Sequence, residues 1–436
     1  MQKIKSKVNL IWFRNDLRVR DNEVLREACE DDANVIGVYC IEPSWFQRGR
    51  FGFKKMEKFR AKFLLESLTD LKVNLSKLNI DLLVHFESAK DVIPSICAEY
   101  QVSNIYLQKE WTQEEVDLVK AVRSKISSSV SWRSFYNQFL YHPEDIPFKF
   151  SDTPQVFTAF RKKLEKYINI RGERDIQKLS GANRIVNNTQ IPTLEDVGFD
   201  TLEQPSKSAF PFLGGETEGL KRLHHYFFAT KKLGFYKKTR NGLVGLDYSS
   251  KFSPWLANGS ISAKTIYWEV KRFESEHYKN QSTYWLIFEL IWRDYFKYIS
   301  LKHQNQIFKL DGILNKSYDW SSNQNQINKW INGQTRSDFV NANMIELKET
   351  GWMSNRGRQN VASFFAKELH LDWRIGAAYF EALLLDYDVH SNYGNWMYVS
   401  GVGNDPRDRK FNVDLQAERY DTDGRYRKLW LQTKLF

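Results

Sequence analysis

VNLIWFRNDLRVRDN, residues 8–22, joins an apolar run to a charged loop and decides how the first part of the chain folds. The run over 8–13 is mostly apolar without strict alternation, which is typical of a strand buried on both faces. In a dinucleotide-binding domain a glycine-rich GxGxxG turn would follow. Because RNDLRVRDN follows instead, we expect a doubly wound sheet without its usual phosphate-binding loop.

Three further runs repeat this pattern and alternate with amphipathic segments. The strand-like runs cover 34–41, 81–86 and 104–108. The amphipathic segments lie around 21–30, 55–79, 91–100 and 113–127. This alternation predicts βαβ units, and hence an α/β domain with a parallel sheet over residues 1–140.

The rest of the chain has a different pattern. Residues 167–213 lose periodicity and gather Asn, Gly, Pro and Ser, which predicts a long linker that we assign to 141–213. Residues 214–436 lack strand signals, which predicts an all-α domain. The expected helices cover 216–232, 262–277, 283–303, 337–350, 355–370 and 373–388. Gly351 stands where a helix would end, and Ser354 and Asp372 stand where N-caps would lie.

Composition indicates a folded, soluble protein. A length of 436 residues suits two domains. A net charge of +11 favours a polyanionic partner such as nucleic acid. A basic protein that binds no polyanion would explain the charge about equally well. We expect a cytoplasmic protein without a membrane partner, because no run approaches the roughly 20 apolar residues that span a bilayer and no signal peptide is evident. The 3 cysteines lack the spacing of a zinc site.

A serine-rich stretch precedes one expected helix. Ser249, Ser250 and Ser253 cluster with Lys251, so hydroxyls, backbone N–H groups and a cation come together. Such a group suits a phosphate. The alternative is a turn that caps the helix.

A carboxylate lies on an aromatic helix face in YWLIFELIWRDYFKYI (284–299). At helical spacing Glu289 falls in line with Trp285 and Trp292, and Arg293 is four residues on, in ion-pair position. One interpretation is a structural Glu289–Arg293 pair. The other is that Glu289 accepts hydrogen bonds from a flat polar substrate, because a carboxylate in apolar surroundings needs a partner.

Two later stretches are unusually polar for buried helices. The first places amides and guanidinium groups at the start of an apolar helix: Asn355, Arg356, Arg358, Gln359 and Asn360. The second ends an apolar helix with Asp386, Asp388 and Asn392. These three are too few ligands for Mg²⁺, so we expect no metal and a buried arginine partner, for which Arg358 is the candidate. Together the stretches predict a pocket for a large, flat cofactor that carries phosphates.

Five motifs resemble those of the photolyase/cryptochrome family: WFRNDLR (12–18), SSKFSPWLANGSIS (249–262), ELIWRDYF (289–296), GWMSNRGRQNVASF (351–364) and DYDVHSNYGNW (386–396). The wider stretches, together with GVGNDPRDRKFN (401–412), are similar to the cryptochrome DASH branch. The resemblance covers nearly the whole chain. It implies an α/β domain, a long linker and an all-α domain that binds FAD, and we expect a monomer.

The resemblance implies a bent FAD held by residues of the helical domain. By position these are Tyr236, Ser249, Ser250, Lys251, Phe252, Ser253, Glu289, Arg293, Asn355, Arg358, Asp386, Asp388 and Asn392. Asp386 and Asp388 would face Arg358, the ribose–adenine part and the flavin edge. Asn392 would lie near the flavin N5 and tune its chemistry.

Three tryptophans match the family's electron-transfer chain: Trp396, Trp373 and Trp320. Without the motif, a core role would be the default interpretation. Glu110, in LQKEWTQEE, matches the glutamate that holds a methenyltetrahydrofolate antenna in DASH relatives. Trp45 stands where those relatives often carry a smaller side chain.

The family reaction is light-driven splitting of cyclobutane pyrimidine dimers in DNA by an electron from excited reduced flavin. The resemblance implies that Glu289 hydrogen-bonds the flipped-out dimer and that Trp292 packs against it. Gln359 and Tyr398 replace the methionine and tryptophan of photolyases that repair double strands. Both changes make the pocket more polar, which implies repair mainly in single-stranded DNA; RNA stays open as a partner.

Two alternatives to a repair enzyme are compatible with these motifs. The first is a blue-light photoreceptor that binds nucleic acid and signals with little or no repair. The second is a flavin-free basic nucleic-acid-binding protein, which Asp386, Asp388 and Arg358 disfavour. Yellow colour in the purified protein would separate the flavin-free alternative from the others.

Overall fold

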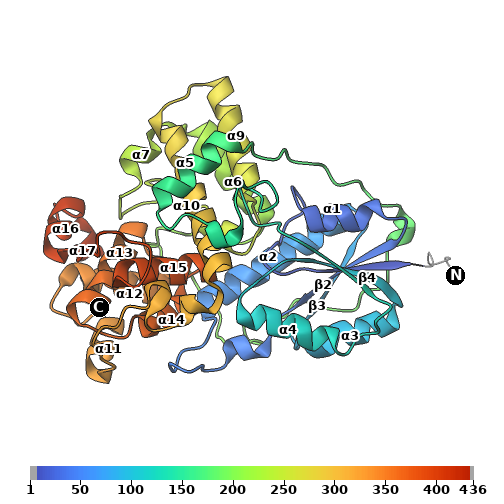
Figure 1. Ribbon diagram of the computed structural model, residues 1–436, viewed down its shortest axis with the longest axis horizontal. Helices are drawn as coiled ribbons and strands as arrows, with labels where there is room; N and C mark the ends of the chain where they lie inside the picture. Colours follow the sequence, from blue (N-terminus) through green and yellow to red (C-terminus); the bar gives the residue numbers. More distant parts are fainter. Residues whose placement is uncertain (1–6, 433–436) are drawn as a thin grey trace.

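A computed structural model describes residues 7–432. A sheet flanked by helices forms one part of the molecule, and helices alone form the other (Figure 1). This arrangement confirms the predicted combination of an α/β domain and an all-α domain. Among the described residues, no helix is both long enough and apolar enough to cross a bilayer.

The sheet is parallel and has the strand order β3-β2-β1-β4-β5. Its strands are β1 (Val8–Trp12), β2 (Asn34–Cys40), β3 (Asp81–His85), β4 (Val102–Gln108) and β5 (Ser131–Phe135). The first four match the predicted runs. The edge strand β5 was missed because its sequence, SWRSF, is half exposed and has no continuous apolar run.

Helices cover both faces of this sheet. They are α1 (Glu23–Glu30), α2 (Lys58–Lys77), α3 (Ala89–Glu99) and α4 (Gln113–Arg123). Leu25 of α1 and Leu68 of α2 pack into the core on one face, and Ile93 of α3 and Val122 of α4 pack into the core on the other. Burial on both faces explains why the central strands read as continuous apolar runs.

The segment predicted as a linker contains a helix and then an extended stretch. Helix α5 (Phe157–Tyr167) packs its Phe160 against Tyr295, with ring centroids 5.3 Å apart. Beyond α5 the chain runs along the edge of the sheet, where the Thr189 hydroxyl accepts from the Val84 backbone N–H at 3.0 Å. Such a covering segment protects the unpaired edge of β3. The domain boundaries at 140 and 213 stay a prediction.

The helical domain surrounds α10 (Gln281–His303). Its other helices are α6 (Glu216–His224), α7 (Tyr236–Thr239), α8 (Ser253–Ala257), α9 (Ala263–Glu276), α11 (Gln324–Ile331), α12 (Asp338–Thr350), α13 (Asn355–Ser363), α14 (Trp373–Leu383), α15 (Val389–Ser400), α16 (Val413–Tyr420) and α17 (Arg425–Leu431). The predicted caps are confirmed: Gly351 ends α12, and Ser354 and Asp372 accept backbone N–H groups at the starts of α13 and α14.

The predicted end of one helix is wrong. The helix expected over 373–388 ends at Leu383, because the backbone becomes extended at Leu384. Asp388 then caps a new helix, α15, by accepting the Ser391 N–H at 2.8 Å. Because of this break, neither Asp386 nor Asp388 lies on the surface of α14; Asp386 is buried, and the Asp388 side chain is 11% exposed.

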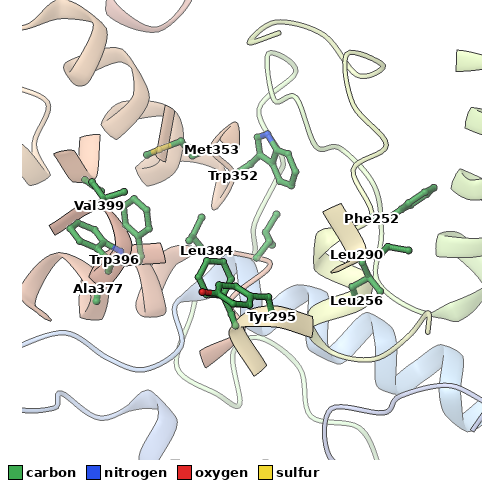
Figure 2. Packing of buried hydrophobic residues seen from close by; sticks show 14 of the residues in the cluster. Phe252, Leu256, Leu290, Tyr295, Trp352, Met353, Ala377, Leu384, Trp396 and Val399 are labelled. Atoms are coloured by element: carbon green, nitrogen blue, oxygen red, sulfur yellow. The ribbon is translucent and has the colours of Figure 1, made fainter. Parts of the chain in front are cut away.

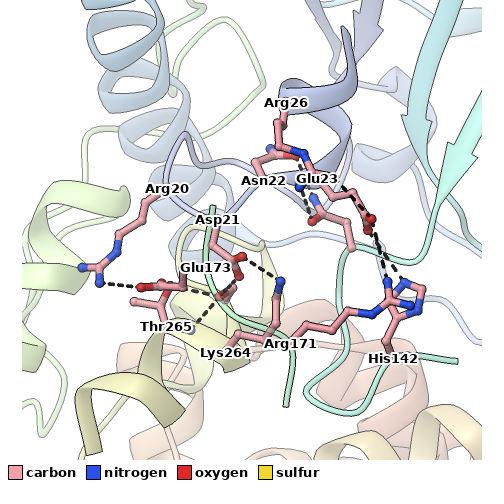
Figure 3. A network of polar contacts seen from close by, with 12 residues as sticks. Arg20, Asp21, Asn22, Glu23, Arg26, His142, Arg171, Glu173, Lys264 and Thr265 are labelled. Carbon is pink, nitrogen blue, oxygen red and sulfur yellow. Dashed lines mark hydrogen bonds and ion pairs between the residues drawn. The ribbon is translucent and has the colours of Figure 1, made fainter. Parts of the chain in front are cut away.

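The charged loop after β1 docks the helical domain. The Arg18 guanidinium donates to Gly259 O at 3.0 Å and to Asn137 O at 2.9 Å. On the helical side, Glu216 accepts the backbone N–H groups of Val19 and Arg20. Figure 3 shows the neighbouring contact, in which Lys264 pairs with Asp21 at 2.7 Å. The loop that lacks a glycine cradle therefore joins the two domains.

Candidate functional site: a cavity in the helical domain

Most of the predicted cofactor residues line one cavity of about 550 Å³. They are Tyr236, Ser249, Ser250, Lys251, Phe252, Ser253, Glu289, Arg293, Asn355, Arg358, Asp386 and Asp388. Apolar side chains complete the walls, with Leu256 on one side and Val399 on the other (Figure 2). A hollow of about 90 Å³ beside the cavity is lined by Asn392 and Trp396 and shares Asp386 and Asp388 with it. Residues more than a hundred positions apart thus converge.

The serine-rich turn presents a buried cation. Lys251 is 2% exposed, and among residues 7–432 its Nζ has no hydrogen-bond acceptor. The Nζ lies over the rings of Tyr248 and Trp352, 3.3 and 4.5 Å from their centroids. Burial lowers the Lys251 pKa well below its ordinary value. A desolvated ammonium group beside a cavity suits an anionic ligand group.

Arg222 holds this turn in place and was missed by sequence reasoning. Its guanidinium donates to the carbonyl oxygens of Ser249 and Ser250, both at 3.1 Å, and to Asp247 at 2.7 Å. Arg222 lies on α6, and nothing in its local pattern distinguishes it from a surface arginine. Its role follows from the backbone carbonyls that the turn places around it.

The two acids after α14 have different partners. Arg358 pairs with Asp386 at 2.9 Å, as expected. Asp388 pairs instead with Lys297 of α10 at 2.8 Å, because Asp388 begins α15, which packs against α10. Burial alone would raise the Asp388 pKa, but Lys297 and Arg293 contribute to holding it well below its ordinary value. This acid therefore stays ionised inside the domain.

Of the two interpretations of Glu289, the structural one, an ion pair with Arg293, is wrong. Glu289 pairs with Arg240, whereas Arg293 donates to Gln138 O at 2.6 Å and to Leu256 O at 2.9 Å. Leu256 lies near the end of α8, where helix carbonyls lack partners inside the helix, so these acceptors take up the Arg293 donors. Burial raises the pKa of Glu289, although Arg240 opposes the shift. The Glu289 side chain keeps 27% exposure at the cavity mouth.

The other predicted substrate residues surround this mouth. Trp292 stacks on Phe157 of α5 with centroids 3.7 Å apart, and its edge meets Tyr398 at 6.1 Å. Gln359 accepts a hydrogen bond from Arg356 at 2.8 Å. All of these except Phe157 line the cavity. Sequence reasoning missed Phe157 because it lies in the segment predicted as linker.

The chain matches two family models, one in each part of the chain. The model described as DNA photolyase matches residues 9–178, and the FAD binding domain of DNA photolyase matches residues 285–434. A cryptochrome DASH from Gloeobacter violaceus is 44% identical over 430 residues, which is 98% of this chain and 86% of that protein. The chain belongs to the photolyase/cryptochrome family, in its cryptochrome DASH branch.

Solved structures agree with the family assignment. A Synechocystis cryptochrome superposes with a TM-score of 0.94 at 44% identity, covering 99% of this chain and 89% of that one. A class III photolyase from Agrobacterium tumefaciens superposes with a TM-score of 0.80 at 26% identity, covering 98% and 87% of the two chains.

The DASH chain carries a FAD-binding domain, and the cavity residues fit that cofactor. Lys251 and the serine hydroxyls would hold the phosphates, because the lysine ammonium is buried without an acceptor. Arg358, Asp386 and Asp388 would offer hydrogen bonds to the polar rings and ribose. The individual residue assignments stay predictions.

The three predicted tryptophans lie on adjacent segments of the DASH chain. Trp396 lines the small hollow, and its ring packs against Gly376, three residues after Trp373 on α14. Trp320 precedes Ser321, which forms a β-bridge with the residue two positions before Trp373. Trp396 and Trp373 are buried, and Trp320 is partly exposed.

Trp330 is a further aromatic neighbour that sequence reasoning missed. It is buried, and its ring lies edge-on to Trp396 with centroids 6.3 Å apart. Its indole N–H donates to Val361 O at 3.2 Å, which fixes the ring. No motif marks Trp330, so only packing reveals its position.

A second cavity, of about 530 Å³, lies where β1 and β4 end and meets the helical domain. The chain runs in opposite directions from this pair of strands, and ligands of doubly wound sheets bind at such switch points. Asn15 follows β1 and Glu110 follows β4, while Lys297 and Asp388 line the cavity from the helical side. Trp45 forms part of the wall without filling the cavity.

Buried acceptors face the second cavity. Among the described residues, Gln108 Oε1, Glu115 Oε2 and Gln138 Oε1 have no hydrogen-bond donor. Burial raises the Glu110 pKa, and burial followed by the charge of Glu110 raises the Glu115 pKa to about 7. A heterocycle rich in N–H groups would satisfy these acceptors. Sequence reasoning identified Glu110 in this cavity but missed Gln108, Glu115 and Gln138. The position of the switch point after β1 and β4 was the signal that could have indicated them.

Proposed function

We propose that this chain is a FAD-dependent, blue-light-driven lyase that splits cyclobutane pyrimidine dimers, mainly in single-stranded DNA. The observation that carries the proposal is Glu289 at the mouth of the cavity that the predicted flavin residues line. Its carboxylate pairs with Arg240, and Trp292 lines the same cavity. Bound reduced flavin supplies the electron for ring opening when it absorbs light.

The residues at the mouth receive and hold the dimer. Glu289 accepts N–H groups from a pyrimidine edge, which requires Arg240 to turn toward the incoming DNA phosphates. Trp292, held flat by Phe157, offers an apolar wall. A dimer enclosed here is removed from the base stack and from water.

The preference for single strands is supported by two polar side chains at the mouth. Gln359 is engaged by Arg356, and the Tyr398 hydroxyl accepts from Arg409 at 3.1 Å. Both side chains are polar, and a tyrosine ring is a smaller wedge than a tryptophan ring, so less is available to replace stacking lost from a duplex. A lesion in a single strand has no base pair to break, so less stabilisation is needed.

The test is repair of one oligonucleotide that contains a single dimer, as single strand and as duplex, under blue light with reduced protein. We expect faster repair of the single strand. Glu289→Gln should slow repair about tenfold or more, since hydrogen bonds to charged groups contribute ~1.5–3 kcal/mol, while FAD absorbance is retained. Glu99→Gln, an exposed acid on α3 of the α/β domain, is the matched control.

Absence of repair in both substrates by yellow, photoreducible protein would reject the lyase and favour the photoreceptor alternative. Loss of flavin in Glu289→Gln would mean that Glu289 serves the cofactor and not the substrate.

We further propose that the second cavity holds methenyltetrahydrofolate as an antenna. The buried acceptors of Gln108, Glu115 and Gln138 match the amino and ring N–H groups of a pterin, and Glu110 lines the same cavity. Reconstitution with the folate should add its near-ultraviolet absorbance to the flavin spectrum. Glu110→Gln should weaken that uptake, and equal uptake would reject Glu110 as a ligand.

A further inference from the structure

An aromatic ladder continues along α10 beyond the cavity mouth. Trp285 stacks on Phe288 with centroids 4.7 Å apart and planes 23° apart. Phe288 meets Phe157 edge-on at 5.1 Å, and Phe157 stacks on Trp292. Trp285 and Phe288 are both partly exposed, so the ladder leads from the proposed dimer site to the surface. Packing alone does not account for two large rings left at the surface beside a polar mouth.

Cations accompany these exposed rings. The Lys237 ammonium lies 4.3 Å from the Trp285 centroid, and the Arg161 guanidinium lies 5.6 Å from that of Phe288. Arg240 stands at the cavity end of the ladder. The nearby acid Glu165 pairs with Arg161 at 2.6 Å, and Lys237 also donates to Gln281. This surface therefore combines flat rings with positive charges.

We propose that Trp285 and Phe288, flanked by Lys237 and Arg161, form a stacking platform for unpaired bases next to the lesion. Exposed rings that alternate with cations are the chemistry of single-stranded nucleic-acid binding. A base that stacks on Trp285 displaces the Lys237 ammonium, which then meets a backbone phosphate. An apolar protein partner would not require these cations, so nucleic acid is the favoured occupant.

The platform rests on the proposed function and deepens it, because it supplies a positive reason for single-strand preference. Bases in a duplex are already stacked on their neighbours and gain little from a protein ring. Unpaired bases gain the full stacking free energy when they bind a protein ring. The platform adds affinity for the bases that flank the dimer, and this affinity does not depend on repair of the dimer.

The experiment measures binding of undamaged oligothymidine of about 15 nucleotides, a length near one single-strand site, by fluorescence anisotropy with FAD-loaded protein. Trp285→Ala should weaken binding about tenfold, and Trp285→Phe should restore most of the affinity. Trp268→Ala is the matched control, because Trp268 is 37% exposed on α9 and is absent from the cavity lining. Lys237→Gln should reduce the slope of log affinity against log salt by about one phosphate contact.

Unchanged oligothymidine affinity in Trp285→Ala, or an equal loss for single strand and duplex, would overturn the platform. A second readout uses the dimer as a bare dinucleotide. Trp285→Ala should lose more affinity for the long strand than for the dinucleotide. If the wild type repairs no dimer yet binds oligothymidine through Trp285, the platform stands and the repair proposal fails. Thermal midpoint and flavin content of each variant separate these outcomes from misfolding.

Discussion

Lys297 is a single residue that connects the two cavities through Asp388, which lines both. Its side chain is 4% exposed and donates to Asp388, which lines the main cavity, while Lys297 itself lines the second cavity near Glu110. A buried carboxylate deprived of its cation is costly, typically about 3–5 kcal/mol. The integrity of the flavin cavity should therefore depend on a residue that no family motif singled out.

Lys297→Met should leave Asp388 buried without its partner and lower both the FAD content and the thermal midpoint. Lys297→Arg keeps the charge and should retain most of the flavin. The ratio of flavin to protein absorbance after gel filtration measures the effect. Equal flavin content in the methionine variant would show that Asp388 is adequately neutralised by Arg293 alone.

Glu346 gives the protein a specific pH dependence. This acid is 1% exposed on α12, and the Tyr426 hydroxyl donates to it at 2.6 Å. Burial raises the Glu346 pKa from 4.5 to about 7. Between these values the folded state binds more protons than the unfolded state, so its contribution to stability is present below about pH 4.5 and is lost as the pH rises through 7.

Glu346→Gln should remove this loss. We expect the thermal midpoint of the glutamine variant, relative to wild type, to increase as the pH is raised from about 5 to 7.5, with up to about 3 kcal/mol of differential stability. Differential scanning fluorimetry across that range is the measurement. A difference that does not change with pH would place the Glu346 pKa outside the window.

Helix α14 positions the Trp396 side chain of helix α15. The Trp396 ring of α15 occupies the space where a side chain at Gly376 of α14 would lie. An added Cβ at Gly376 would be 2.2 Å from the ring atom Cη2. The helix break between them places Asp388 at the start of α15. Close contact of the two helices thus places Trp396 beside the segment that carries Trp373.

Gly376→Ala should displace Trp396, cost about 1–3 kcal/mol of stability through overpacking, and slow flavin photoreduction. Gly181→Ala is the control, because no atom lies within 4 Å of an added Cβ there. Illumination with an external reductant, followed by absorbance, reports photoreduction. Wild-type kinetics in Gly376→Ala would show that Trp396 carries no electron, or that its ring tolerates the shift.

At the scale of the whole molecule, two domains are joined through a loop and a glycine. Gly259 has φ of 75°, and a Cβ there would lie 2.0 Å from Asn15 O in the loop after β1. Arg18 donates to the Gly259 carbonyl from the same loop. The second cavity lies beside this junction, since Asn15 and Asn258 both line it.

Gly259→Ala should separate the loop from the helical domain, lower the thermal midpoint and weaken folate binding in the cavity between the domains. Gly245→Ala is matched to it, because Gly245 also has a positive φ, 92°, but no atom lies within 4 Å of an added Cβ. The difference between the two variants isolates the domain contact from backbone strain. Equal effects of both substitutions would assign the loss to backbone strain alone.

Much of the fold could be read from local pattern. Apolar runs located β1 to β4, and helical periodicity located α9, α10 and α12. Capping residues located the end of α12 and the starts of α13 and α14. These features depend on neighbours within a few positions, so periodicity and turn chemistry suffice to predict them. Sequence reasoning missed the edge strand β5 and the break before α15. The first depends on pairing with β4, and the second on the distant partners of Asp386 and Asp388.

The sequence by itself therefore determined the two kinds of domain and the residue types of the cavity. Only the tertiary structure decided which charges meet: Glu289 with Arg240, 49 positions away, and Asp388 with Lys297, 91 positions away. The physical reason is desolvation. A buried charge must be neutralised by whichever opposite charge the folded backbone brings within reach, and helical spacing cannot reveal that partner.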